Sequence, residues 1–341
     1  MSPSRASGRL LGLLGLFLAA ALVISLFSGR IQIHWQEMVS FGLHLLKGQD
    51  LPADLVHKEL VFLWIRLPRC LMALLVGSAL AVSGAVYQAL FRNPLVSPDI
   101  LGVSAGCTFG AALGLILASD VFGLVQVLSF FFGITAVCLS LGLARAISIK
   151  PVIVLVLAGI VVMSFFNALL MVVKYFSDPY DELPGIIFWV MGSLSRVSWE
   201  HVATMAPFTL VGLIVFIVLG FRLNILSLGD IQAKSLGMNP GLFRFILITV
   251  SSFMVAVSVA CCGQIAWIGL VIPHMARSLA GPEHQKMIPV TALLGAIFLL
   301  LADSAARSIS SAEIPVGIIT ALTGAPIFGY FLYKNRNTGW I

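Results

Sequence analysis

Asp303 and Arg307 are the ionisable residues that lie closest to the interior of a long apolar run in this chain. Four positions apart, they share one face of a helix and can pair with each other. If the run crosses a membrane, an unpaired charge there is costly, so a structural ion pair is one reading. A proton relay is the other, but it requires a series of acidic groups through the membrane, and none is found. The sequence therefore argues against proton-driven transport.

Other patterns of catalytic or metal-binding residues are absent from the sequence. It contains no Walker A loop and no HExxH or GxSxG motif, and its histidines are scattered. The cysteines have no CxxC spacing and lie in apolar surroundings, which is typical of packing residues: Cys70, Cys107, Cys138, Cys261 and Cys262. We expect no catalytic residue, no metal site and no cofactor bound by this chain.

Three arginines, Arg66, Arg69 and Arg307, are predicted to lie at the outer ends of helices. Such residues often extend the charged group to the membrane surface while the aliphatic stem lies along apolar surroundings. The alternative is that the guanidinium groups are exposed on the outer face and bind carboxylates of a soluble partner. The sequence leaves both readings open.

The composition is that of a membrane protein. Hydrophobic residues make up 60% of the chain and charged residues 10%, and the mean hydropathy is +1.06, which excludes a soluble domain. The apolar runs are continuous rather than alternating, which indicates spanning helices and not a β-barrel. The net charge of +6 comes from basic residues that sit singly at the ends of these runs, so no nucleic-acid partner is expected. We predict one all-α polytopic transmembrane domain over residues 1–341.

The number of membrane crossings follows from run lengths and charge. Spanning helices need about 20 residues, and nine charge-free runs are that long or nearly so: 10–29, 71–91, 100–119, 121–144, 151–173, 202–221, 245–273, 287–302 and 314–333. The run 245–273 is long enough to fold back near Gly263, which makes ten helices. Ten crossings place 12 Lys/Arg and 3 Asp/Glu inside, against 8 and 11 outside, whereas nine crossings give 9 and 4 against 11 and 10. Because basic residues accumulate on the cytoplasmic side, we predict ten helices with both termini in the cytoplasm.

The longest polar interruption in the second half of the chain is 222–244, which this topology places in the cytoplasm. Within it, Asp230–Gly237 is predicted to be a short helix that starts after Gly229 and stops at Gly237. One interpretation is a helix that rests on lipid head groups. The other is a helix that fits a soluble subunit and passes its movement into the membrane.

The segment 178–193 is too short to span a bilayer and is predicted to lie outside, with a short apolar helix between Pro184 and Gly192. Trp189 would suit an interfacial helix, since aromatic side chains gather at the membrane surface. The alternative is a helix that dips into the outer mouth of a path and acts as its gate.

Two further patterns concern helix packing. Glycines recur every four residues at Gly102, Gly106, Gly110 and Gly114, and on a helix they form a smooth stripe that predicts close contact with another helix. A weak repeat relates 81–98 to 256–273, and in the predicted topology the two copies run in opposite directions.

Six segments, in the same order, resemble the FecCD/BtuC-type permeases, the membrane subunits of ABC importers for vitamin B12, haem and iron–siderophores. They are RLPRCLMALLVGSALAVSGAVYQALFRNPLVSPDILGVSAG (66–106), FWVMGSLSRVSW (188–199), LGDIQAKSLGMN (228–239), GLVIPHMAR (269–277), LLADSAAR (300–307) and PVGIITALTGAPIFGYFLYK (315–334). The resemblance extends from about residue 10 to residue 336 and implies the ten-helix type II ABC importer permease fold.

The resemblance also implies partners and residue roles. The partners would be a second permease, most simply the same chain, two cytoplasmic subunits that bind ATP and Mg²⁺, and an external substrate-binding protein. ATPase coupling would fall to Gly229, Asp230, Gln232, Ala233, Lys234, Leu236 and Gly237. Docking of the binding protein would fall to Arg66, Arg69 and Arg307, and the inner gate to Ser148, Ile149 and Lys150. The outer gate and the path would involve the short helix 183–193 with Trp189, Gly192, Ser193 and Arg196, together with Asn167 and Thr323.

The expected cargo is a bulky metal chelate, an iron–siderophore first and haem or cobalamin next, carried by alternating access across a bacterial or archaeal cytoplasmic membrane. The tetrapeptide GSLS at 192–195 looks more like the iron-chelate permeases than the cobalamin branch. Arg196 would suit an anionic ligand, but a plain surface charge is equally compatible. The alternatives are a permease of this family for another cargo such as an oxyanion, an ion-gradient-driven secondary transporter, and a membrane-embedded enzyme, for which no catalytic cluster is found.

Overall fold

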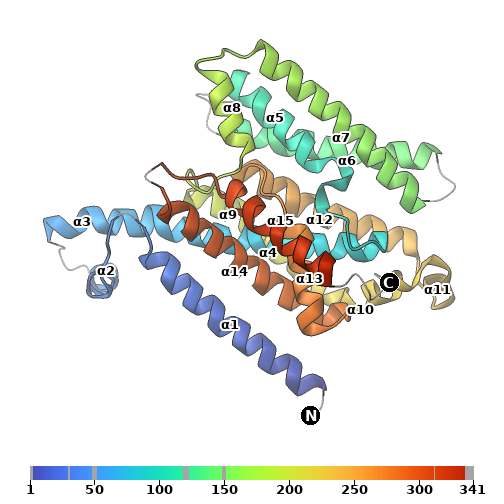
Figure 1. Cartoon of the computed structure of the whole chain (residues 1–341), viewed down its shortest axis with the longest axis horizontal. Coiled ribbons are helices and arrows are strands. Elements are labelled where there is room, and N and C mark those ends of the chain that lie inside the picture. The colour runs from blue at the N-terminus through green and yellow to red at the C-terminus, as the bar shows by residue number, and fades with distance from the viewer. Residues whose placement is uncertain are drawn as a thin grey trace.

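The computed structural model describes residues 3–29, 31–47, 52–117, 123–147, 151–310 and 312–334, and every regular element in these ranges is a helix (Figure 1). Eight helical stretches are long and apolar enough to cross a membrane. They lie in α1 (Pro3–Phe27), the continuous helix from α3 to α4, α6 (Leu124–Ile147), α7 (Pro151–Phe176), α9 (Trp199–Val218), α12 (Pro240–Cys262), α14 (His284–Ser308) and α15 (Val316–Lys334). Two shorter apolar helices, α5 (Val103–Leu117) and α13 (Ile268–Ala280), complete the predicted ten.

The chain reverses between α12 and α13, as predicted from the long run 245–273. α12 ends at Cys262, and Gly263 follows with a φ of 70°. Tyr87 Oη lies 3.1 Å from Ser252 Oγ in α12, and Arg277 Nη2 in α13 donates to Gln88 Oε1 at 3.3 Å. Tyr87 and Gln88 are adjacent in α4, so α12 and α13 both pass beside the same turn of that helix. The chain must therefore reverse between them.

The helix that contains Arg66 and Arg69 is longer than predicted. α3 (Ala53–Leu60), the π-helical turn η1 (Val61–Arg66) and α4 (Leu67–Phe91) form one helix whose apolar part has 37 residues. At 1.5 Å per residue it is about 55 Å long, against about 30 Å for the hydrocarbon core of a bilayer. The prediction that the two arginines lie at a helix end is wrong. The wide turn ends at Arg66, two residues before Pro68, where it can accommodate the missing N–H and the ring, and the helix continues.

α4 is the centre of the fold and packs against α9, α12, α13 and α14. Glycines make two of these contacts possible. A Cβ added to Gly77 would lie 2.3 Å from the carbonyl oxygen of Gly295 in α14, and a Cβ added to Gly84 would lie 1.9 Å from that of Gly269 in α13. No side chain fits at such distances, so these helix backbones touch directly.

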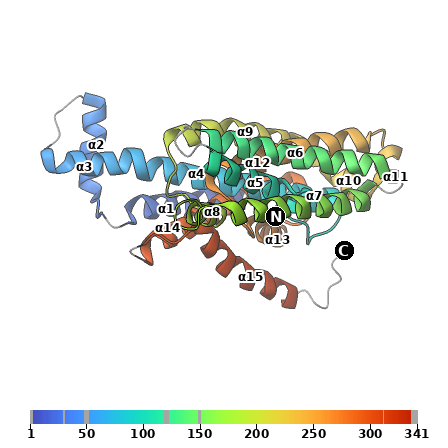
Figure 2. The ribbon, with the colours of Figure 1, turned by 90° about the horizontal axis from the view of Figure 1, so that it is seen from above.

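The bundle has two ends, which we name after the short helices that lie there (Figures 1 and 2). The α8 end carries α8 (Glu182–Val190), α3 and α2 (Trp35–Lys47), and the α11 end carries α10 (Gly220–Leu228) and α11 (Asp230–Ser235). α1 begins and α15 ends toward the α11 end (Figure 1), as an even number of crossings requires. A short 3-10 helix, η2 (Pro98–Leu101), connects α4 to α5.

Candidate functional site

α11 is a six-residue helix between α10 and α12. Gly229 precedes it with a φ of 119° and Gly237 follows it with a φ of 75°, conformations that residues with a side chain rarely adopt. The Asp230 carboxylate accepts a hydrogen bond from Arg244 Nη2 at 2.7 Å, and Ala233 is fully buried. The short helix predicted for Asp230–Gly237 is therefore present, and its last residues form the turn that ends it.

Two large apolar residues are exposed here, one on α11 and one directly after it. Leu236 is 63% exposed, and Ile231, which the sequence analysis did not single out, is 79% exposed. Gln232 and Lys234 are exposed beside them. The exposure of Ile231 could have been predicted once Ala233 was placed on the buried side. A residue two positions earlier lies on the opposite side of a helix. Exposed apolar side chains on so short a helix indicate a surface that a partner covers.

The start of α11 also lies against the end of α4. A Cβ at Gly229 would be 3.1 Å from Arg92 Nη1, and Arg92 ends α4 in the left-handed conformation with a φ of 49°. α11 is thus joined to α12 through Asp230 and Arg244 and meets the central helix through Gly229. A displacement of α11 can therefore be transmitted directly to α12 and to α4.

The arginines predicted for docking are buried at the α8 end, with exposed fractions of 4% for Arg66, 4% for Arg69 and 7% for Arg307. Asp303 is fully buried between two of them: Arg69 Nε donates to Asp303 Oδ1 at 2.9 Å, and Arg307 Nε lies 3.1 Å from Asp303 Oδ2. The predicted pairing of Asp303 with Arg307 is confirmed. Arg69 Nη1 also donates to Glu313 Oε2 at 2.8 Å.

Two of these guanidinium groups also bind the end of α1. Arg66 Nη1 donates to the carbonyl oxygen of Leu26 at 2.7 Å, and Arg307 Nη2 donates to Ser25 Oγ at 2.8 Å. The expectation that these groups are exposed on the outer face is therefore wrong. Buried charges require internal partners, and the chain supplies them from α1 and α14 and from the segment between α14 and α15.

α8 is held by close backbone contacts at its C-terminal side. Gly192 follows it with a φ of 71°, and Ser193 N donates to the carbonyl oxygen of Cys262 at 2.8 Å. A Cβ at Gly317 would lie 2.0 Å from the carbonyl oxygen of Met191. α8 is thus connected to the end of α12 and to the first turn of α15, so a movement of either helix reaches it.

The other predicted gate and path residues lie on separate elements. Asn167 is exposed on α7, which packs against α5 and α6, and Thr323 is exposed on α15, which packs against α13 and α14. Trp189, on α8, packs against the main core, and Arg196 is exposed between α8 and α9. Asn167 and Thr323 therefore lie on helices that pack against different neighbours within one subunit. The predicted inner gate at 148–150 lies outside the described residues.

The glycine stripe lies mostly in the contact between α5 and α6. A Cβ at Gly106 would be 2.3 Å from the carbonyl oxygen of Phe132, and one at Gly110 would be 2.2 Å from that of Leu128. Gly114 meets the backbone of α6 in the same way. Gly102 differs, because it precedes α5 in the left-handed conformation and faces α7.

No three His, Cys, Asp or Glu side chains gather closely enough to hold a metal ion in the parts of the chain that the structure describes.

Comparison with known proteins decides the family. The FecCD transport family is matched over residues 17–334. This chain belongs to that family. It is 40% identical over 328 residues to the molybdate import system permease protein MolB of Haemophilus influenzae, with 96% of each chain covered. It is 38% identical over 342 residues to the vitamin B12 import system permease protein BtuC of Klebsiella pneumoniae, with 98% of this chain and 96% of that one covered.

The fold agrees with a solved structure. An inward-facing structure described as a metal-chelate type ABC transporter superposes with a TM-score of 0.84 at 38% sequence identity, over 96% of this chain and 99% of that one. The resemblance drawn from the six motifs is confirmed, and so is the type II permease fold. The chain is a multi-pass permease of an ABC importer, and its function is transport.

Proposed function

We propose that this FecCD-family permease imports a bulky metal chelate, an iron–siderophore first and haem or cobalamin next, by alternating access. The observation that carries the ATP-driven mechanism is α11, whose exposed Ile231 and Leu236 lie at one end of the bundle on a helix tied to α12. The likeness to a metal-chelate type transporter supports the cargo. An oxyanion is the second candidate, because the 40% identical MolB is a molybdate permease.

In this mechanism the chemistry belongs to two cytoplasmic partner subunits, which bind ATP and Mg²⁺, and this chain binds neither. Closure of these subunits on ATP would push α11 in each of two permeases. Because Asp230 pairs with Arg244 and Gly229 meets Arg92, the push would reach α12 and α4. We assign ATPase coupling to Ile231 together with Gly229, Asp230, Gln232, Ala233, Lys234, Leu236 and Gly237; the buried Ala233 would anchor the helix and the exposed residues would contact the partner.

A second copy of the permease would complete the path. α7 and α15 keep apolar faces exposed in the single subunit: Phe165 is 55% and Met171 70% exposed on α7, and Leu322 is 67% exposed on α15. We assign these faces, with Asn167 and Thr323, to a path between the two copies. A wide apolar path would select weakly, so selectivity would rest with the external binding protein. The gates are assigned to Trp189, Gly192 and Ser193 outside and to Ser148, Ile149 and Lys150 inside.

The external binding protein is proposed to dock at the α8 end by exchange of ion pairs. The Glu313 side chain is 37% exposed and holds the buried Arg69, so a carboxylate of the partner can replace it without exposing Asp303. Arg66 and Arg307 bind the end of α1, so a partner that engages them would act on α1.

The polarity of the chain is tested with single cysteines in a Cys138→Ser background, because Cys138 is the exposed native cysteine of the described residues. We expect Gln232→Cys to react with a membrane-impermeant maleimide only after cells are permeabilised, since α11 faces the cytoplasm in the proposal. The matched control is Tyr180→Cys at the α8 end, where the native side chain is 87% exposed, and it is expected to react in intact cells. Labelling of Gln232→Cys from the medium contradicts the importer polarity.

Coupling and cargo are tested together in proteoliposomes that contain the permease, its ATPase and its binding protein. We expect ATP-dependent uptake of a ferric siderophore, and a decrease of about tenfold or more in the Leu236→Asp variant, because a carboxylate would be buried in an apolar contact. Ser235→Ala on the same helix serves as the control and is expected to leave uptake unchanged. Uptake of molybdate without siderophore uptake would select the second candidate. Uptake without any ATPase would contradict the ATP-driven mechanism.

A further inference from the structure

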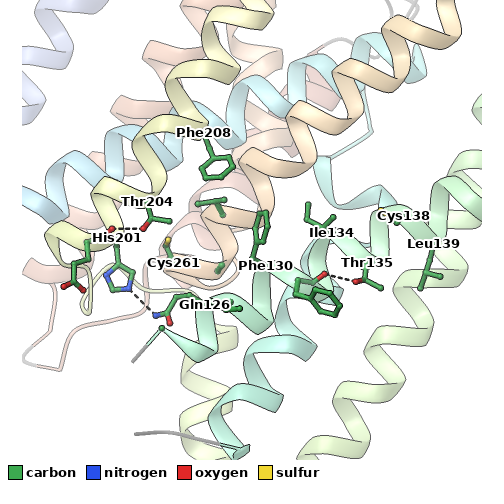
Figure 3. Close-up of a pocket in the computed structure, with 16 residues that line it drawn as sticks. Gln126, Phe130, Ile134, Thr135, Cys138, Leu139, His201, Thr204, Phe208 and Cys261 are labelled. Atoms are coloured by element: carbon green, nitrogen blue, oxygen red, sulfur yellow. Dashed lines mark hydrogen bonds between the residues drawn. The ribbon is translucent and has the colours of Figure 1, made fainter. Parts of the chain in front are cut away.

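A long apolar groove lies between α6, α9 and α12, with a volume of about 880 Å³. Phe130, Ile134 and Phe208 lie along it, and Cys138 lies toward one end (Figure 3). Part of its wall is open in the single subunit, since Phe131 is 57% exposed. All three helices cross the membrane, and the groove is formed by neither α7 nor α15, which we assign to the path. If the second copy covers α7 and α15, as in the proposed function, the groove would face the acyl chains of the bilayer.

The opposite end of the groove is polar. Figure 3 shows Gln126, His201 and Thr204 there, and Glu200 also lines it. These residues lie at the starts of α6 and α9, at the α8 end, where spanning helices meet the membrane surface. Both nitrogens of the His201 ring are engaged, Nε2 at 3.3 Å from Gln126 Nε2 and Nδ1 at 2.8 Å from Ser198 Oγ. His201 therefore has no ring nitrogen left to bind a ligand, and a ligand at this end would have to bind other charged groups.

A smaller cavity of about 230 Å³ continues from this polar end and shares Gln126 and His201 with the groove. Arg196 lines it and is exposed, and within the described residues its guanidinium has no carboxylate or carbonyl partner. The group is held 5.8 Å from the centre of the Phe188 ring. A guanidinium that lies over an aromatic ring and is left unpaired suits a phosphate, to which it can donate two parallel hydrogen bonds.

We propose that the groove and this cavity bind one phospholipid of the phosphatidylethanolamine type. One of its two acyl chains would lie along Phe130 and Phe208, its phosphate would bind Arg196, and its ammonium would lie near Glu200. One cation and one anion at the polar end match a head group that carries both charges, and the volume is in the usual range of ligand pockets. This site goes beyond the transport function, because it takes a lipid and not the cargo; its smaller cavity also borders Trp189 and Ser193, which we assign to the outer gate.

The test is native mass spectrometry of the purified full-length permease, after exchange into detergent with either 1-palmitoyl-2-oleoyl phosphatidylethanolamine or the diacylglycerol with the same chains. We expect retention of about one phosphatidylethanolamine and no diacylglycerol. Arg196→Gln should weaken phosphatidylethanolamine binding by about tenfold, since a charge-assisted hydrogen bond is lost. Cys138→Trp should lower retention, because the larger ring obstructs one end of the groove.

The matched control for Cys138→Trp is Leu210→Trp, an exposed position on α9 that lines neither cavity and should leave retention unchanged. Folding of each variant is checked by its elution volume and thermal midpoint. Equal loss of lipid in Leu210→Trp and Cys138→Trp would show unspecific lipid and overturn the site. Unchanged binding in Arg196→Gln, or equal retention of diacylglycerol, would overturn the phosphate assignment.

Discussion

The substitution Asp303→Asn is expected to lower the free energy of unfolding by about 3–5 kcal/mol, the cost of removing one partner from a buried ion pair. Asp303 is fully buried and is the carboxylate that holds both Arg69 and Arg307. Asparagine has a similar shape but no charge, so two buried guanidinium groups would lose their shared counter-ion. Of the two arginines, Arg69 would still pair with Glu313.

This expectation is checked by thermal unfolding of the detergent-solubilised permease, followed by fluorescence-detected size exclusion. The control is Glu313→Gln, which removes a carboxylate that is 37% exposed from the same arginine and should change stability by about 1 kcal/mol or less. Equal thermal midpoints for Asp303→Asn and the unaltered protein would show that the cluster contributes nothing to stability.

The second large effect is expected for Gly84→Val. The added Cβ would lie 1.9 Å from the carbonyl oxygen of Gly269 and 2.6 Å from its Cα, so only a backbone shift of α4 or α13 can relieve the clash. Overpacking of a core costs about 1–3 kcal/mol even where side chains can adjust, and here the obstacle is backbone. We expect little or no folded permease in the membrane fraction.

The matched control for this variant is Gly142→Val, since a Cβ at Gly142 in α6 would meet nothing within 4 Å. Its effect on stability should stay within about 0.5 kcal/mol, as for other surface substitutions. Normal yield and thermal midpoint for Gly84→Val would mean that α4 and α13 do not pack as closely as the structure has them.

Much of the fold could be predicted because its determinants are local. A backbone in hydrocarbon must satisfy its own hydrogen bonds, so each long apolar run becomes a helix wherever it lies in the fold. Gly263 and the length of 245–273 were enough to predict the reversal between α12 and α13, and Gly229 and Gly237 were enough to delimit α11. The ion pair of Asp303 and Arg307 was also predictable, since helix geometry alone brings the two together.

The surroundings of the arginines could not be predicted in this way. Arg69 meets Asp303 and Glu313, which are 234 and 244 positions away along the chain, so its burial became visible only when α4 and α14 were packed. The helix end expected at Arg66 and Arg69 was wrong for a related reason. A proline usually stops a helix, and whether a π turn replaces the stop depends on the packing around it.

The amino-acid sequence by itself determined ten helices and a short helix outside the membrane, because run length, charge and glycine act through the neighbouring backbone. The permease role came from the resemblance of six segments to a known family. The tertiary structure alone decided which groups are available to partners. It buries the guanidinium groups of Arg66, Arg69 and Arg307, leaves Ile231 and Arg196 open, and forms the groove from α6, α9 and α12. Exposure depends on what distant segments cover, and no local pattern in the chain encodes it.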